Sequence, residues 1–178
     1  MIKNKKISQL VCIIIYVISF YISYLITPES ISNIWLKITI WHIYATLFIY
    51  IGSVILKNSS LYDPFWSVAP VPIVIYLATQ YQNSTTLKVL VLGPILFWAI
   101  RLTRNWIISW KGFDHEDFRY IDLKNTNKFK AEFNNFFGIH LFPTLIVNLG
   151  LFPILYVLTN NVSVNIFLYL ASIFTLSL

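Results

Sequence analysis

The chain has 178 residues, of which 57% are apolar and only 11% charged, and its net charge is +6. Soluble domains carry about a quarter charged residues, so this composition excludes a soluble globule. It predicts an all-α, polytopic bundle of transmembrane helices whose partner is the lipid bilayer. The positive charge indicates loops that face the cytoplasm and does not indicate a nucleic-acid partner. A single cysteine, Cys12, excludes a disulfide framework and a cysteine-based metal site.

Six apolar segments are candidates for membrane spans, for which a helix needs roughly 20 residues. They cover residues 7–26, 38–56, 66–79, 87–110, 136–158 and 162–178. The first follows three lysines, so a cleaved signal peptide is an alternative interpretation, although "TPES" after it lacks the small-x-small cleavage pattern. The third is short and carries Pro70 and Pro72, which predicts a kinked helix or a broken entry.

Basic residues alternate from loop to loop along the chain. Three lysines precede the first span, and Lys57 follows the second. Five more lie between the fourth and fifth spans: Lys111, Arg119, Lys124, Lys128 and Lys130. The positive-inside rule therefore predicts that the N-terminus and the 111–134 loop are cytoplasmic, in a bacterial inner membrane or the endoplasmic reticulum. Without an internal repeat or a soluble segment, residues 1–178 are interpreted as a single membrane domain.

Two arginines lie within the fourth span. If the hydrocarbon region begins at Leu90, Arg101 lies about 16 Å and Arg104 about 21 Å along the helix, in a core about 30 Å thick. Helical spacing places both on one stripe with Trp98 and Asn105. One interpretation is a pair of side chains that snorkel to the interface. The other is an anion-binding cytoplasmic mouth, because guanidinium groups donate paired hydrogen bonds to phosphate.

A second unusual stretch is "SLYDPFWS", residues 60–67. Asp63 precedes Pro64, which predicts an extended or turn conformation. Asp63 is interpreted either as the cap of the following helix or as a carboxylate at the mouth of an aromatic pocket, and both roles are compatible.

A third stretch, "WKGFDHEDFRY" at residues 110–120, gathers charges between apolar spans. A solvated loop would explain the charges alone. The alternation with Phe113, Phe118 and Tyr120 instead favours a segment folded over a cavity. Its acids can pair with its own basic residues or with the arginines of the fourth span. Three scattered histidines without a spacing motif do not predict a metal site, and no P-loop or GxSxG motif is found.

Three motifs, "YDPFWS", "WAIRLTRNW" at residues 98–106 and "KGFDHEDFRY" at residues 111–120, resemble in order and spacing the steroid 5-alpha-reductase-like family of polytopic membrane proteins. The resemblance covers about residues 35–170. It implies a bundle of about seven helices and the NADPH-dependent reduction of a carbon–carbon double bond, conjugated to a ketone, in a steroid-like or other lipid substrate.

The resemblance also implies roles for individual residues. The cofactor would be held by Arg101, Arg104, Asn105, Lys111, Glu116, Asp117, Arg119 and Tyr120, with Glu116 and Asp117 ordering the loop by pairing with the arginines. The substrate would lie near Asp63, Phe65, Trp66 and Trp98. Tyr120 and Tyr62 are the candidate proton donors.

The chain departs from that family at its end. Members continue with an Arg-His-Pro-x-Tyr-like motif that completes the cofactor site, whereas this chain ends at Leu178 without it. We therefore expect a C-terminally truncated sequence that holds half of a cofactor site, with one or more further helices missing. Two alternatives are an S-adenosylmethionine-dependent membrane methyltransferase of the isoprenylcysteine type and a non-catalytic relative. The paired arginines favour a phosphate-rich cofactor, and hence NADPH.

Overall fold

The computed structural model describes residues 2, 4–160 and 162–177, and every regular element in these ranges is a helix. In chain order the helices are α1 (Lys5–Ile26), α2 (Ile34–Leu56), the 3₁₀-helix η1 (Ser59–Tyr62), α3 (Phe65–Val68), α4 (Pro70–Gln80), α5 (Thr85–Ser109), α6 (Phe118–Lys124), α7 (Lys128–Phe133), the π-helix η2 (Asn134–Leu141), α8 (Phe142–Gly150), α9 (Phe152–Thr159) and α10 (Ile166–Ser177).

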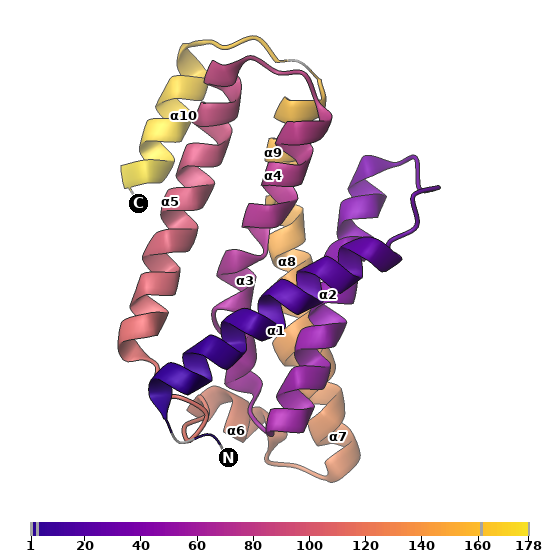
Figure 1. Cartoon of the computed structure of the whole chain (residues 1–178), viewed down its shortest axis with the longest axis vertical. Helices are drawn as coiled ribbons and strands as arrows, with labels where there is room; N and C mark the ends of the chain where they lie inside the picture. The colour runs from indigo at the N-terminus through magenta and orange to yellow at the C-terminus, as the bar shows by residue number, and fades with distance from the viewer. Residues whose placement is uncertain (1, 3, 161, 178) are drawn as a thin grey trace.

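Five helical runs in the described part of the chain are long and apolar enough to cross a membrane: α1, α2, η1–α4, α5 and α7–α9. The shorter apolar helix α10 packs beside α5 (Figure 1). The prediction of an all-α, multi-pass membrane bundle is therefore confirmed. The sixth predicted span corresponds to α10, and its predicted last residue, Leu178, lies outside the described residues.

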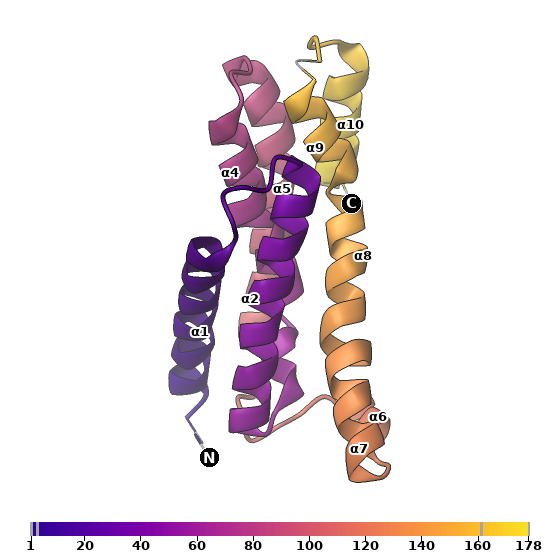
Figure 2. The same cartoon turned by 90° about the vertical axis from the view of Figure 1, so that its right-hand side faces the viewer.

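Helix α1 lies obliquely across α2 on one side of the bundle (Figures 1 and 2). Its buried face carries Cys12, Tyr16 and Phe20 at intervals of four residues, which places them on one helical stripe. The Tyr16 hydroxyl donates a hydrogen bond to the carbonyl oxygen of Leu61 at the end of η1. This packing into the core favours a first span over a cleaved signal peptide.

The third span is broken, as its prolines predict, into η1, α3 and α4. Asp63 lies in a turn at the first break, with φ −53° and ψ −47°, so of the two predicted conformations the structure shows the turn and not the extended one. Its N–H donates to the carbonyl of Ser60, which holds it in the helical turn that ends η1. No side chain caps α3, so the carboxylate is free of the predicted capping role and available for a tertiary contact.

The fifth span begins earlier than predicted, at Lys128 instead of residue 136, and the expected 111–134 loop contains α6 and α7. The polar sequence "KFKAEFNN" hides this start from hydropathy, although it continues the helix. Within η2 the His140 ring donates from Nδ1 to the carbonyl of Asn135 over 2.7 Å. The span is therefore a composite of α, π and α segments.

Buried hydroxyl groups join α2 to the fifth span. The oxygen atoms of Thr46 and Thr144 lie 2.9 Å apart, and the Tyr62 hydroxyl lies 2.8 Å from Thr144. One turn further along α8, the Asn148 amide donates to the Thr39 hydroxyl over 2.7 Å. Because lipid offers no partner for these groups, such bonds join helices within a bilayer.

The basic segments gather at one end of the bundle. The start of α1, the end of α2, and helices α6 and α7 all lie at the bottom in Figures 1 and 2. This arrangement agrees with the alternation of basic loops in the sequence. That this end is cytoplasmic stays a prediction.

Gly112 turns the chain out of α5 towards α6 with φ +99°, a conformation that favours glycine. An added Cβ would lie 3.2 Å from the Ser8 hydroxyl and 3.4 Å from the Lys5 Cα atom. We expect Gly112→Ala to lower the free energy of unfolding by about 1–3 kcal/mol. Titration with sodium dodecyl sulfate in mixed micelles measures this change.

Gly93→Ala in α5 is the matched control, because an added Cβ there meets nothing within 4 Å. Alanine is favoured over glycine inside a helix by about 0.5–1 kcal/mol, so this control is expected to be neutral or stabilising. Equal destabilisation of both variants would contradict the special role of Gly112.

Candidate functional site

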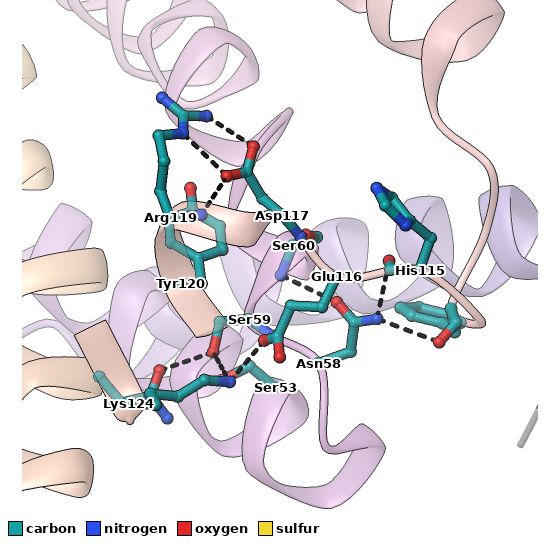
Figure 3. A network of polar contacts seen from close by, with 12 residues as sticks. Ser53, Asn58, Ser59, Ser60, His115, Glu116, Asp117, Arg119, Tyr120 and Lys124 are labelled. Atoms are coloured by element: carbon teal, nitrogen blue, oxygen red, sulfur yellow. Dashed lines mark hydrogen bonds and ion pairs between the residues drawn. The ribbon is translucent and has the colours of Figure 1, made fainter. Parts of the chain in front are cut away.

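The segment that follows α5 is tied to residues 58–60, shortly after the end of α2 (Figure 3). Four hydrogen bonds make the connection: Asn58 Nδ2 to the carbonyls of Phe113 and His115, both 3.1 Å, the Ser59 N–H to the Glu116 carboxylate, and the Asp117 N–H to Ser60 Oγ, 2.9 Å. The charged stretch is therefore folded against the bundle and is not a free solvated loop.

Two ion pairs hold the charges of this stretch. Lys124 pairs with Glu116 and also donates to Ser59 Oγ over 3.1 Å. Arg119 forms a two-bond pair with Asp117, with both distances 2.8 Å, and this guanidinium lowers the pKa of Asp117. Asp117 thus pairs with an arginine as expected, whereas Glu116 pairs with a lysine.

Asp63 and Tyr120 meet although they are 57 residues apart in the chain. The Tyr120 hydroxyl donates to Asp63 Oδ1 over 2.6 Å. Burial, and next the nearby Asp63 carboxylate, hold the pKa of Tyr120 well above its ordinary value. The phenol therefore keeps its proton at neutral pH.

Two adjoining pockets meet at this pair. An apolar pocket of about 500 Å³ lies between the third and fifth spans, and its wall includes Tyr62, Tyr120, Phe142, Pro143 and Ile146. A polar pocket of about 330 Å³ has a wall that includes Ser60, Trp106, Ser109, Trp110, His115 and Asp117. Asp63, Trp66 and Arg119 line both pockets. The carboxylate of Asp63 therefore stands where an apolar space meets a polar one.

The second candidate proton donor and the two remaining predicted substrate residues lie around this junction. Tyr62, the candidate donor, lines the apolar pocket. Phe65 is fully buried against the Tyr62 ring and lines neither pocket. Trp98 makes an edge contact with Trp66, with ring centroids 5.6 Å apart, but lines a separate apolar pocket.

Four predicted cofactor residues, Arg101, Arg104, Asn105 and Lys111, are exposed and line neither pocket. Helix geometry explains why Arg104 does not line the polar pocket, because each residue of a helix is rotated about the axis by about 100° from the one before it. Trp106, which lines the polar pocket, therefore points about 200° away from Arg104. The structure brings together Asp117, Arg119 and Tyr120, with Glu116 beside them.

Comparison with known proteins places this chain in a family. Residues 48–177 match a family described as a protein of unknown function, DUF1295. The chain belongs to the DUF1295 family. No curated protein and no solved structure matches it. The matched range contains Asp63, Tyr120 and every residue that lines the two pockets, so the candidate site of this DUF1295 protein lies within the family domain, not in α1.

Sequence reasoning missed the residues that position the site of the DUF1295 protein. Asn58, Ser59 and Ser60 hold the loop, and their signal was a polar run one residue before the "YDPFWS" motif. The indoles of Trp106 and Trp110 stack with centroids 4.9 Å apart in the wall of the polar pocket. Among the described residues, no three His, Cys, Asp or Glu side chains lie close enough together to hold a metal ion.

Proposed function

We propose that this DUF1295 protein is a membrane-embedded reductase that uses NADPH to reduce a conjugated carbon–carbon double bond in a steroid-like or other lipid substrate. The observation that supports it is the hydrogen bond from Tyr120 to Asp63 where the apolar pocket meets the polar one. A lipid enone has an apolar body and one polar carbonyl, which suits an apolar pocket with a polar edge. The resemblance of three motifs to the steroid 5-alpha-reductase-like family points the same way.

The chain's own residues would handle the proton. NADPH, when bound, supplies a hydride to the β carbon of the enone. A carbonyl in the apolar pocket would meet the phenols of Tyr120 and Tyr62, which both line it. Tyr120 carries its proton at neutral pH and lies in the wall of the apolar pocket, so it would be the general acid for a carbonyl placed there. Asp63 accepts the hydrogen bond of that hydroxyl, so a proton taken up by its carboxyl would free the phenol hydrogen for the substrate carbonyl and then pass to the phenol oxygen.

The polar pocket suits one portion of NADPH. The Arg119 guanidinium is the group that best recognises phosphate, and the stacked indoles of Trp106 and Trp110 offer a flat aromatic wall. A pocket of about 330 Å³ is too small for a whole dinucleotide. These residues would therefore hold one end of the cofactor.

Thermal unfolding of the detergent-solubilised protein tests the cofactor. A ligand at about 100 times its dissociation constant adds about 2.7 kcal/mol to the free energy of unfolding. We expect NADPH to raise the unfolding midpoint, S-adenosylmethionine to leave it unchanged, and Arg119→Gln to remove the NADPH effect. Lys128→Gln, which removes an exposed charge at the same end of the bundle, is the matched control.

The other outcomes of the thermal unfolding experiment distinguish the reductase from its alternatives. Protection by S-adenosylmethionine alone would contradict the reductase and identify a methyltransferase. Protection by neither compound would contradict both and support a non-catalytic relative. Equal loss in Arg119→Gln and Lys128→Gln would show that NADPH responds to general surface charge and not to the polar pocket.

A further inference from the structure

A groove lies between α5 and the α3–α4 segment, and it shares no lining residue with the polar pocket. Its volume is about 400 Å³, and Val68, Val71 and Pro72 form one wall. Residues of α5 from Leu96 to Ile107 form the other. Every lining side chain is apolar except those of Thr103 and Arg104, and the Arg104 side chain is exposed. A single cation therefore stands in an apolar groove on the outer surface of a membrane bundle.

The length of the groove matches one leaflet of a bilayer. Leu96 and Ile107 are 11 residues apart, which is about 16 Å along the helix axis. Half of a hydrocarbon core about 30 Å thick is about 15 Å. A single acyl chain that enters from the charged end of the bundle would thus fill the groove as far as Leu96.

Arg104 lies near the end of the groove where the headgroup of a bound lipid would be. α5 ends at Ser109, five residues or about 7.5 Å beyond Arg104, at the end of the bundle where the basic segments gather (Figure 1). A long arginine side chain can extend its guanidinium from that depth towards the interface. There it can donate two parallel hydrogen bonds to a phosphate group.

We propose that this groove binds one anionic phospholipid, with an acyl chain along α5 between Leu96 and Ile107 and the phosphate on Arg104. Arg104 is thereby assigned to a membrane lipid instead of the cofactor that the sequence resemblance implied. The site does not depend on the proposed reductase activity, because none of its lining residues lines the polar or the apolar pocket.

Native mass spectrometry, with phosphatidylglycerol and phosphatidylcholine of identical acyl chains, tests the proposal. One basic residue near the surface contributes about 1 kcal/mol of attraction to anionic lipid, so we expect about five-fold tighter binding of phosphatidylglycerol. Arg104→Gln should abolish this preference, and Arg104→Lys should keep part of it. Lys128→Gln, with the same change of charge at an exposed position, should keep all of it. Thr103→Trp, which fills the groove, should weaken both lipids equally.

Several results would contradict the proposal of a lipid site in this groove. An unchanged preference in Arg104→Gln would remove the phosphate from this residue. Equal loss in Lys128→Gln would show diffuse surface attraction. Undiminished lipid binding in Thr103→Trp would place the lipid elsewhere. Loss of NADPH protection in Arg104→Gln, with the lipid preference intact, would return Arg104 to the cofactor. Unfolding midpoints verify the fold of each variant, and the two Arg104 variants decide the proposal if Thr103→Trp does not fold.

Discussion

Asp63→Asn is expected to lower kcat for the reduction of a lipid enone by about 10²–10⁴-fold, the usual contribution of a positioned acid or base. Asparagine keeps the size of the side chain and can still accept a hydrogen bond, but it cannot exchange a proton with Tyr120. KM should change much less, because the apolar walls that bind the substrate remain. Steady-state kinetics with NADPH and a steroid enone measure both constants.

Four further variants make this expectation specific. Asp114→Asn changes an exposed acid of the same loop and should leave kcat unchanged. Tyr120→Phe should cost about as much as Asp63→Asn, and the double variant should cost little more, because residues that act as a unit are strongly non-additive. Full activity in Asp63→Asn, with activity lost in Tyr62→Phe, would contradict this assignment and identify Tyr62 as the proton donor.

Hydropathy was sufficient to predict the long continuous spans. α1, α2 and α5 each present more than 20 consecutive helical residues, and their positions agree with the predicted segments to within a few residues. The composite spans were harder, because η1 begins in the polar run Asn58–Ser60 and α7 begins in a charged segment. There, the side chains of Asn58 and Asn127 cap the first turns of η1 and α7, and hydropathy carries no information about such caps.

In the candidate site, too, the sequence predicted individual residues but not the contacts between them. Asp63 and Tyr120 were each singled out from local sequence, yet their contact depends on four bonds between residues 58–60 and the 113–117 segment. Local patterns cannot predict such long-range pairs. For Arg104 the helical period could only relate it to neighbours on its own helix, and it could not show that Trp106, about 200° away, faces the polar pocket.

The four bonds between residues 58–60 and the 113–117 segment include one to Glu116, which lines neither pocket. Of the residues outside the pocket walls, Glu116 is therefore the one whose replacement should most disturb the site. Its carboxylate accepts from both the Lys124 ammonium and the Ser59 N–H, and so connects α6 to η1. The side chains of Glu116 and Lys124 are only 16% and 24% exposed, so water cannot fully replace the pair. Hydrogen bonds to charged groups contribute about 1.5–3 kcal/mol each, far more than an exposed ion pair.

Glu116→Gln is therefore expected to lower the free energy of unfolding by about 2 kcal/mol, because the Lys124 charge loses its counter-ion in a half-buried place. Titration with sodium dodecyl sulfate in mixed micelles measures the loss, and the exposed Asp114→Asn should stay within about 0.5 kcal/mol of the wild type. Replacing both partners, with Lys124→Met added to Glu116→Gln, should recover part of the stability, since no unpaired charge remains. If Glu116→Gln unfolds like the wild type, the pair is no more than a surface contact. The loop that carries Tyr120 to Asp63 would then be held by the bonds of Asn58 and Ser60 alone.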